Sequence, residues 1–324
     1  MSFYTGKNIV ITGAAGITGQ AAVKRLLDEG AFVRASVFNK KKLTISHKNL
    51  EVVYYDLMDY QQCLEVIKDI DICLNFVSFN KGARGHSDPN NYLDYVRFNL
   101  NLCINMFDVA VRAKIDRFGF VGSSTMYPDV SYPVKEEEAY ESNPHESYRG
   151  VGWLKRYCEQ VIEYYQSISD VKFAITRTSS IYGPHDSFNE DGHVIPMLIK
   201  KAESKMNPFE IWGDGTQMRD FIYADDVVDG LLTVLEKSPN ARAYNIAAGD
   251  GTSVIDLVKM ITEKYGYQPK LKFDLSKPVM IPKRLIDISR AKNELNWHPK
   301  HTLSEGLSKT IDWYNDNKEL YSNE

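Results

Sequence analysis

Short apolar runs alternate with amphipathic stretches along the first half of the chain. A short apolar run is typical of a buried strand, and apolar residues three and four positions apart are typical of one helix face. On this pattern we predict strands at 8–11, 31–37, 50–55, 71–77, 118–122 and 172–177, and helices at 19–28, 59–68, 92–113 and 153–167. Strands that alternate with helices at this spacing indicate βαβ units and a parallel sheet.

The alternation breaks in the second half of the chain. Residues 182–219 contain three prolines and a glycine-rich Gly-Asp-Gly-Thr turn, and from about Ser253 helices and strands follow no steady order. We therefore predict an α/β fold with a doubly wound parallel sheet and a smaller C-terminal substrate-binding domain. The expected boundaries are 1–180 for the sheet domain and 181–324 for the cap, with roughly 221–245 returning to the sheet domain.

Composition and charge narrow the class of protein. The 324 residues include 39 lysines and arginines against 43 aspartates and glutamates, a formal net charge of −4 at pH 7. With 43% hydrophobic and 25% charged residues, the chain has the composition of a folded globular protein rather than of a disordered one. The mild acidity argues against a nucleic-acid partner, and the absence of a long apolar run argues against a membrane partner. The first residues carry no leader pattern, so we expect a cytoplasmic protein.

The four cysteines show no metal-binding spacing. Cys63, Cys73, Cys103 and Cys158 are scattered along the chain and form no Cys-x-x-Cys pair. We therefore expect free thiols in a reducing compartment and no metal site.

Residues 12–19, Thr-Gly-Ala-Ala-Gly-Ile-Thr-Gly, follow the first predicted strand and open the first predicted helix. The glycines allow a tight turn and the close backbone approach that a pyrophosphate needs, and a helix N-terminus favours an anion. A glycine-rich loop placed between a strand and a helix is a strong indication of dinucleotide binding. We expect Gly13, Gly16, Ile17 and Gly19 to contact the cofactor.

The TGxxGxxG spacing of this loop resembles the extended short-chain dehydrogenase/reductase family, whose sheet is of the Rossmann type. The resemblance implies further cofactor contacts after the third and fourth predicted strands and on the long helix that follows. These residues are Asp56, Leu57, Phe76, Ser78 and Asn99.

The sequence contains little that distinguishes an NAD-binding from an NADP-binding site. An acidic residue at the end of the second strand would bind the ribose 2′-hydroxyl of NAD, but residues 35–42 contain neither Asp nor Glu. Lys40, Lys41 and Lys42 would suit the 2′-phosphate of NADP, although a lysine run is more often a solvated surface. We expect NAD, because it suits the oxidation argued below, and keep NADP as the alternative.

Members of this family carry a serine or threonine after the fifth strand and a Tyr-x-x-x-Lys helix. The tyrosine exchanges a proton with the substrate hydroxyl, and the lysine lowers the tyrosine pKa and holds the nicotinamide ribose. Here Ser123 and Lys155 match the serine and the lysine, but the tyrosine position is Val151. An aliphatic side chain cannot exchange a proton, so the departure falls on the most informative position.

Three interpretations of Val151 are open. Another base, such as Tyr148, His193 or water, could take the proton. The enzyme could instead work with weak proton-transfer help, at a loss of about 10²–10⁴-fold in rate. The third interpretation, a non-catalytic protein that binds a nucleotide sugar, is the least favoured because Ser123, Lys155 and the glycine loop are all present.

Two later blocks resemble GDP-fucose synthases and related GDP-sugar enzymes. Residues 179–201 contain Tyr-Gly-Pro-His-Asp and His-Val-Ile-Pro, and residues 211–221 contain Trp-Gly-Asp-Gly and Met-Arg-Asp-Phe. The resemblance implies a GDP-linked manno-type sugar as the substrate. The residues expected to hold it are Ser180, His193, Val194, Lys201, Trp212, Arg219 and Arg284.

Individual roles follow from the same resemblance. Arg219 would bind the diphosphate, which suits a planar guanidinium, Trp212 would contact guanine, and His193 matches the epimerisation acid. The epimerisation base of those enzymes is a cysteine, but Thr125 stands at its position. A threonine hydroxyl is a poor base at neutral pH, so 3,5-epimerisation is not expected. The expected catalytic residues are Ser123, Thr125, Lys155 and His193.

The sequence thus favours an oxidoreductase that oxidises C4 of a GDP-manno-type sugar to a 4-keto sugar with NAD. The valine at the tyrosine position resembles the C4 dehydrogenases that act on GDP-D-glycero-D-manno-heptose in capsular polysaccharide biosynthesis. A GDP-sugar reductase, a 4-epimerase and a non-catalytic binding protein are the alternatives. Helices 92–113 and 153–167 match those that pair in dimers of the family, so we expect at least a homodimer.

Overall fold

A seven-stranded parallel sheet dominates the computed structural model, which describes residues 2–38, 43, 45–79, 89–189, 192–277 and 279–321. From edge to edge the strands are β11 (Ala243–Ile246), β6 (Lys172–Thr178), β5 (Arg117–Ser123), β4 (Ile72–Asn75), β1 (Asn8–Thr12), β2 (Phe32–Ser36) and β3 (Leu50–Val53). The strand order reverses between β1 and β4, and open α/β sheets bind their ligands beyond the carboxyl ends of the strands at such a point.

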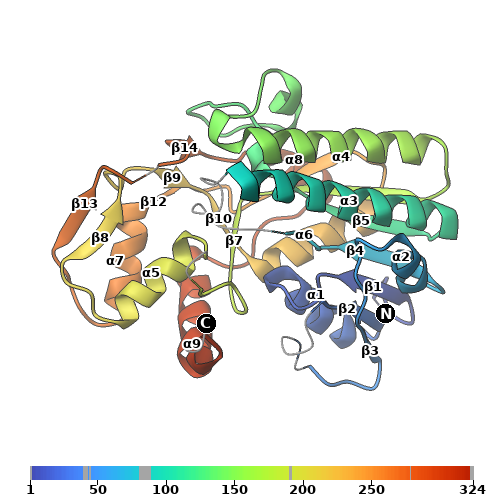
Figure 1. Cartoon of the computed structure of the whole chain (residues 1–324), viewed down its shortest axis with the longest axis horizontal. Coiled ribbons are helices and arrows are strands. Elements are labelled where there is room, and N and C mark those ends of the chain that lie inside the picture. Colours follow the sequence, from blue (N-terminus) through green and yellow to red (C-terminus); the bar gives the residue numbers. More distant parts are fainter. Residues whose placement is uncertain are drawn as a thin grey trace.

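Helices cover both faces of this sheet (Figure 1). One face carries α1 (Ile17–Asp28), α6 (Ala224–Lys237) and α8 (Ser289–Leu295), and the other carries α2 (Tyr60–Ile67), α3 (Pro89–Ala113) and α4 (Arg149–Ser167). Side chains alternate along a strand, so Ile9 and Ile11 of β1 join the first core and Val10 joins the second. The predicted Rossmann-type, doubly wound α/β fold is therefore confirmed.

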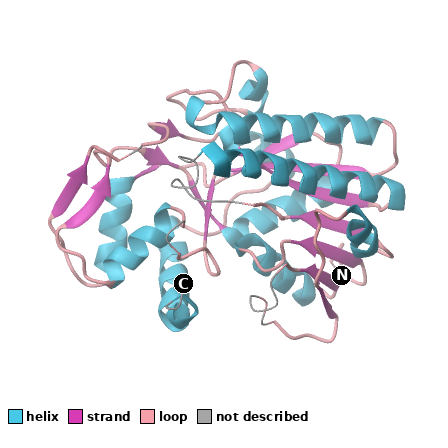
Figure 2. Cartoon of the chain, in the orientation of Figure 1, coloured by secondary structure: helices cyan, strands magenta, loops and turns pink. Residues whose placement is uncertain are grey.

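A smaller unit lies at the opposite end of the molecule from β1, β2 and β3 (Figure 2). Its strands are β7 (Ser180–Tyr182) with β10 (Phe221–Tyr223), β8 (Phe209–Trp212) with β13 (Leu271–Asp274), and β12 (Thr252–Ser253), β9 (Met218–Arg219) and β14 (Lys283–Arg284) in a third sheet. Its helices are α5 (Val194–Glu203), α7 (Val254–Lys264) and α9 (Leu303–Asn317). They enclose a separate core that includes Phe209, Ile261 and Ile311. We call this unit the cap.

The ten elements predicted from the hydrophobic pattern are all present, with shifted ends. The helix predicted from Trp153 begins earlier, at Arg149, because the 3₁₀ turn Glu146–Tyr148 leads directly into it. The four cysteines are buried and free, as expected. Within the described ranges, no helix combines the length and the hydropathy of a membrane-spanning segment.

Candidate active site

The glycine loop between β1 and α1 is as tight as its spacing predicts. Gly13 has a φ of +64°, and a Cβ there would lie 2.9 Å from the carbonyl carbon of Phe76, just after β4. A Cβ on Gly19 would overlap the Gly13 carbonyl oxygen and lie 2.7 Å from the Cα of Ala14. The loop therefore packs directly on the end of β4, and a side chain at either glycine would force the backbone apart.

The start of α1 fits an anion. Gly16 is the N-cap residue, Ile17 begins the helix, and no side chain of the described residues caps it. The first turn also contains no acidic residue. The helix N–H groups and the positive end of its dipole are thus offered to an anionic group. The close glycines and the uncapped helix together fit the pyrophosphate of a dinucleotide.

Phe76, Ser78 and Asn99 come together beside this loop. The Asn99 amide accepts the Phe79 N–H at 2.9 Å and donates to the Phe79 carbonyl oxygen at 2.8 Å. The hydroxyl of Ser78 donates to the same amide at 3.1 Å. Asn99, a buried residue of α3, therefore holds the segment after β4 in place, and its direct contact with a cofactor stays a prediction.

Asp56 and Leu57 lie in the turn between β3 and α2. Asp56 is exposed, and its carboxylate accepts the Met58 N–H at 2.9 Å. Leu57 is buried, and its carbonyl oxygen accepts the Asn105 amide at 3.0 Å. The adenine contact of this turn stays a prediction. The lysines that would bind a 2′-phosphate, Lys40 to Lys42, lie outside the described residues.

Ser123 ends β5 at the carboxyl edge of the sheet. Its Oγ accepts the Thr125 N–H at 3.2 Å and the Thr125 hydroxyl at 2.9 Å, which leaves the Ser123 proton to donate to a substrate oxygen. Lys155 of α4 reaches the same strand, where its Nζ donates to the Val121 carbonyl oxygen at 2.9 Å and lies 4.8 Å from the Phe120 ring centroid. Three of the four predicted catalytic residues thus meet at one strand end.

The first turn of α4 carries the departure from the family pattern. Val151 is buried, and a Cβ on the adjacent Gly152 would lie 2.8 Å from the Thr125 carbonyl oxygen. The first turn of α4 therefore packs on Thr125 through Gly152, the residue next to Val151. Tyr148 is the N-cap residue of α4, and its phenol interacts with the Arg219 guanidinium of the cap.

Two arginines lie side by side in the cap. Arg219 and Arg284 are paired positions of the parallel strands β9 and β14, so their side chains leave the sheet on the same face. Arg284 is buried and donates to the carbonyl oxygens of Pro128 at 2.9 Å and Tyr127 at 3.2 Å, while its Nε has no hydrogen-bond partner in the described part of the chain.

Burial and charge repulsion make this pair receptive to an anion. Burial lowers the pKa of Arg219. Burial, together with the charge of Arg219, lowers the pKa of Arg284 to about 10. Two neighbouring guanidinium groups repel each other, and an anion bound between them would remove that cost.

The other predicted substrate residues are spread over the cap. Ser180 begins β7, Val194 begins α5, and Trp212 ends β8. Lys201, in the last turn of α5, donates from Nζ to the Glu210 carbonyl oxygen at 2.8 Å and thereby holds β8. Lys277 lies with its Nζ 5.7 Å from the Trp212 ring centroid.

His193 is the N-cap residue of α5 and belongs to an ion pair that the motifs do not predict. Its Nδ1 lies 3.6 Å from Oδ1 of Asp186. The imidazole is 51% exposed, whereas the carboxylate side chain is 4% exposed. The contact with Asp186 raises the pKa of His193.

A buried polar network behind the catalytic strand end also goes beyond the motifs. Arg177 of β6 pairs with both carboxylate oxygens of Glu159 at 2.7 and 3.0 Å and donates to the Tyr127 hydroxyl at 3.1 Å. That hydroxyl donates to Asn245 of β11 at 2.6 Å. The network fixes the segment after Ser123, and the only signal for it in the sequence is Glu159, one helical turn beyond Lys155.

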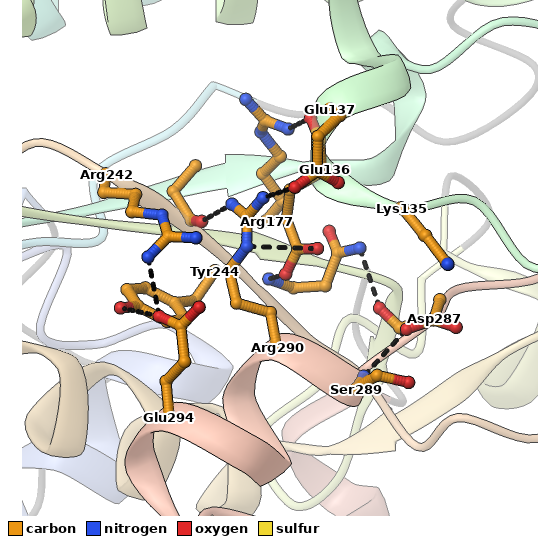
Figure 3. Close-up of polar contacts among 12 residues, drawn as sticks. Lys135, Glu136, Glu137, Arg177, Arg242, Tyr244, Asp287, Ser289, Arg290 and Glu294 are labelled. Atoms are coloured by element: carbon orange, nitrogen blue, oxygen red, sulfur yellow. Dashed lines mark hydrogen bonds and ion pairs between the residues drawn. The ribbon is translucent and has the colours of Figure 1, made fainter.

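Figure 3 shows the outer side of this network, where the segment around Glu136 meets α8. Arg177 donates to the Glu136 carbonyl oxygen at 2.7 Å, and Arg290 of α8 pairs with Glu137. Arg242 and Glu294 form a further ion pair at 2.7 Å. These contacts tie the segment that follows Ser123 to the C-terminal third of the chain.

Asp220 is a further buried group next to Arg219. It accepts the Ser179 hydroxyl at 2.6 Å and the N–H groups of Ala248 and Gly249 at 2.9 and 2.8 Å. Burial raises the pKa of Asp220 to about 6. The Arg-Asp-Phe sequence was the signal for this residue.

In the same described ranges, no group of three His, Cys, Asp or Glu side chains could hold a metal.

Comparisons with known proteins agree with this fold and identify the family. The NAD dependent epimerase/dehydratase family matches residues 9–247. GDP-L-fucose synthase 1 of Arabidopsis thaliana is 26% identical over 94% of this chain and 92% of its own length, and GDP-mannose 3,5-epimerase of the same plant is 28% identical over 94% and 81%. The UDP-glucose 4-epimerase of Thermotoga maritima, solved with UDP-glucose, has a TM-score of 0.84 at 22% identity and covers 96% of this chain and 99% of its own.

The family match runs from β1 to β11 and includes the glycine loop, Ser123 and Lys155. The resemblance drawn from the sequence is therefore confirmed, and the expected cofactor class agrees with the NAD dependence of the family. This chain belongs to the NAD dependent epimerase/dehydratase family.

Proposed function

We propose that this protein oxidises C4 of a GDP-linked manno-type sugar to a 4-keto sugar, with NAD as the oxidant. The observation that carries the proposal is the strand end where Ser123 and Lys155 meet. It is supported by the sequence, which has Val151 at the position that matches the family's tyrosine. This combination resembles the C4 dehydrogenases of GDP-D-glycero-D-manno-heptose. A GDP-heptose of capsular polysaccharide biosynthesis is therefore the first substrate to try.

The arginine pair of the cap supports a nucleoside diphosphate sugar. Arg219, which is partly buried, and Arg284, which is buried, offer two positive charges on adjacent strands, and a diphosphate can accept from both. The GDP-L-fucose synthase and GDP-mannose 3,5-epimerase relatives, which match almost the whole chain, support guanosine as the nucleoside. Trp212 would then pack against the guanine.

The described residues also suit the cofactor. The glycine loop and the start of α1 would hold the pyrophosphate, and Lys155 would hold the nicotinamide ribose. When bound, the nicotinamide supplies the acceptor for the hydride that leaves C4. Ser123 would donate a hydrogen bond to the oxygen on C4, while Thr125 and His193 contact the sugar. We propose NAD rather than NADP because the reaction is an oxidation.

A reductase or a 4-epimerase acting on a related GDP-sugar is the alternative. The name of the GDP-mannose 3,5-epimerase relative favours it, because that name describes a change at the sugar ring of a GDP-sugar. Thr125 counts against 3,5-epimerisation, since its hydroxyl is a weak base and donates to Ser123. A protein that binds the nucleotide sugar without turnover is the third candidate.

Absorbance of the reduced nicotinamide separates these candidates. NAD-loaded protein would be mixed in turn with GDP-mannose and GDP-D-glycero-D-manno-heptose, and a rise in absorbance with either sugar would identify a dehydrogenase. If both sugars bind in calorimetry and neither changes the absorbance, the dehydrogenase is wrong. Oxidation of NADH by the 4-keto sugar would then favour the reductase.

We further propose a homodimer formed through α3 and α4. These helices lie side by side on one face of the sheet (Figure 1), and α4 exposes Trp153, Tyr157 and Tyr164. Residues four and eleven positions apart share a helix face, so the three rings form one apolar stripe. An equivalent stripe of a second copy would cover it. A monomer in light scattering would contradict this assembly.

The layers of the fold indicate which residues would form a cofactor domain and which would form a substrate cap. We propose that residues 1–180, with roughly 221–245, form the cofactor domain, because α6 and β11 pack with the large sheet. The rest of 181–324, apart from α8, which packs on the large sheet, would form the substrate cap. A cytoplasmic location is part of the same proposal, because nucleotide sugars and NAD are found there.

A further inference from the structure

A proton acceptor is the part that the strand end lacks. Oxidation of a hydroxyl group releases a proton, and Val151 cannot take it. The loops before α4 and α5 carry several titratable side chains, among them Tyr148, His185 and His193. Their surroundings differ enough to separate them.

Tyr148 lies at the end of the proposed substrate site where the diphosphate would bind. Its phenol interacts with the guanidinium of Arg219, and it is also an electrostatic neighbour of Arg284. Both arginines face the proposed diphosphate. Tyr148 is therefore placed to assist phosphate binding and not to receive a proton from the sugar ring.

His185 is unsuited to proton transfer. Its ring centroid lies 4.6 Å from that of Trp313, and burial lowers the pKa of His185 to about 4. An imidazole in such a place resists the positive charge that it would gain as a base. In the described part of the chain, no ion pair is formed with His185.

His193 has the environment that His185 lacks. Its ring is half exposed, and its Nδ1 lies 3.6 Å from the carboxylate of Asp186. Asp186 is itself held firmly, because its Oδ1 accepts the Ser187 N–H at 2.7 Å and its carbonyl oxygen accepts the Tyr321 hydroxyl at 3.0 Å.

The Asp186 carboxylate is short of partners for a buried charge. Its side chain is 4% exposed, and Oδ2 has no hydrogen-bond partner among the described residues. Among the described residues, His193 is the one ion-pair partner of Asp186. Since burying an unbalanced charge is costly, a proton on His193 would supply the charge that this carboxylate lacks.

The position of this pair relative to the sheet is also suitable. Ser123 pairs with Thr178 at the carboxyl edge, and the chain continues from Thr178 through β7 into the loop that carries Asp186 and His193. The chain therefore leaves the large sheet next to the strand end that holds Ser123, and the loop follows directly after β7.

We propose that Asp186 and His193 form a dyad that replaces the missing phenol. On oxidation, the O–H bond of the C4 hydroxyl breaks and its proton goes to Nε2 of His193. The C4–H bond breaks as well, its electron pair leaves as hydride to the NAD of the proposed function, and the second bond between C4 and its oxygen forms. Asp186 is a positioning residue: its carboxylate lies 3.6 Å from Nδ1, where it favours the Nδ1–H tautomer with the lone pair on Nε2, and it balances the imidazolium that forms. The dyad rests on the proposed C4 oxidation.

The first test measures the pairing without turnover. NMR of protein labelled with ¹³C-histidine follows the pKa of His193, one of seven histidines, and His193→Gln identifies its resonance by its loss. Because the carboxylate raises the pKa of His193, Asp186→Asn should lower it. The new amide oxygen still accepts the Ser187 N–H, so the turn is retained. Asp312→Asn, at an exposed carboxylate of α9, is the control and should leave the pKa unchanged.

The second test is the pH dependence of NADH formation in a single turnover. His193 must be neutral to accept the proton, so the rate rises with pH through its pKa. In Asp186→Asn the rising limb should move to lower pH and the plateau should fall by about tenfold or more, whereas His193→Gln should lose the limb and about 10²–10⁴-fold in rate. Asp312→Asn should change neither.

The outcomes distinguish the dyad from the function on which it rests. If no GDP-sugar reduces NAD, the proposed function fails and the NMR titration still decides the pairing. If wild-type protein reduces NAD and His193→Gln keeps its rate, the dyad is overturned and the function stands. A pKa of His193 that is the same with and without the Asp186 carboxylate also overturns it.

Discussion

The cofactor side and the substrate side of this site are held in place by different forces. On the cofactor side, close backbone packing sets the shape: Gly13 and Gly19 let the loop lie on β4, and Asn99 fixes the next segment through main-chain hydrogen bonds. On the substrate side, the arrangement depends on buried charged groups, of which Arg284 and Asp186 each keep a polar atom without a hydrogen-bond partner in the described ranges.

This difference indicates how each side works. Close packing of backbone gives a rigid cradle whose fit depends on volume. A buried charge with incomplete partners is costly by itself, and it becomes favourable when a ligand or a transferred proton balances it. We therefore expect substitutions on the cofactor side to abolish binding or folding, and substitutions on the substrate side to change KM and pH dependence.

The largest effect is expected for Gly19→Val. The new side chain would overlap the Gly13 carbonyl oxygen, so the loop would have to leave β4. Calorimetry should find no NAD binding, and Tm should fall. Gly16→Ala is a graded comparison, because a Cβ there lies at 3.3 Å from the same oxygen and needs only a small adjustment. Equal NAD affinity in both variants would contradict the rigid cradle.

The next largest effect is expected for Ser123→Ala. Loss of the hydroxyl that donates to the reacting oxygen should lower turnover by about 10²–10³-fold, as loss of one such donor does elsewhere. NAD affinity should not change, because the glycine loop is untouched. Ser167→Ala, at the far end of α4, is the control and should keep full activity. An unchanged rate in Ser123→Ala would refute the assigned role.

The parts of this molecule that depend on local sequence were predictable. Strand and helix periods, and the glycine spacing between a strand and a helix, act within a few residues, so the sheet and the cofactor loop followed from them. Val151 was identified as the departure for the same reason, since its distance from Lys155 along one helix is fixed.

The charged contacts of the substrate side depend on chain segments far apart, and sequence patterns do not encode them. Glu159 meets Arg177 across two elements, and Arg284 meets carbonyl oxygens of the segment after Ser123. The resemblance names Arg284 as a substrate residue, but only the register of β14 shows that Arg284 is buried while its neighbour Lys283 is exposed. Such choices are made by tertiary packing.

Arg219 offers a test of intermediate size. Arg219→Ala should raise the KM for the GDP-sugar by about tenfold to a hundredfold, because a hydrogen bond to a charged group contributes about 1.5–3 kcal/mol. The affinity for NAD should stay the same. Arg219→Lys should recover only part of the loss, since an ammonium group cannot bind two phosphate oxygens as a guanidinium does.

The control for this test is Arg242→Ala. Arg242 forms a solvent-exposed pair with Glu294, and such pairs contribute little to stability. It should therefore leave KM unchanged. If Arg219→Ala lowers turnover and NAD affinity together while KM stays constant, Arg219 belongs to the cofactor side and the comparison fails.

The smallest effect is expected in the pH dependence of stability at Asp220. Burial raises the pKa of Asp220 to about 6 from an ordinary 3.8, so the folded protein binds this proton more tightly than the unfolded chain does. The resulting stability is fully present below about pH 4 and is lost as the pH rises through 6. From pH 4 to pH 7, the unfolding free energy of the wild type should therefore fall by about 1–3 kcal/mol relative to that of Asp220→Asn.

Chemical denaturation across this pH range measures that difference, and its slope matters more than its value at any one pH. The amide of Asp220→Asn loses the acceptor for one N–H of the 248–249 turn, which shifts the free energy equally at every pH. Asp312→Asn, with an exposed carboxylate, should show no slope. A flat difference for Asp220→Asn would mean that this carboxylate is balanced in the folded protein, and the substrate side would then owe its form to packing, as the cofactor side does.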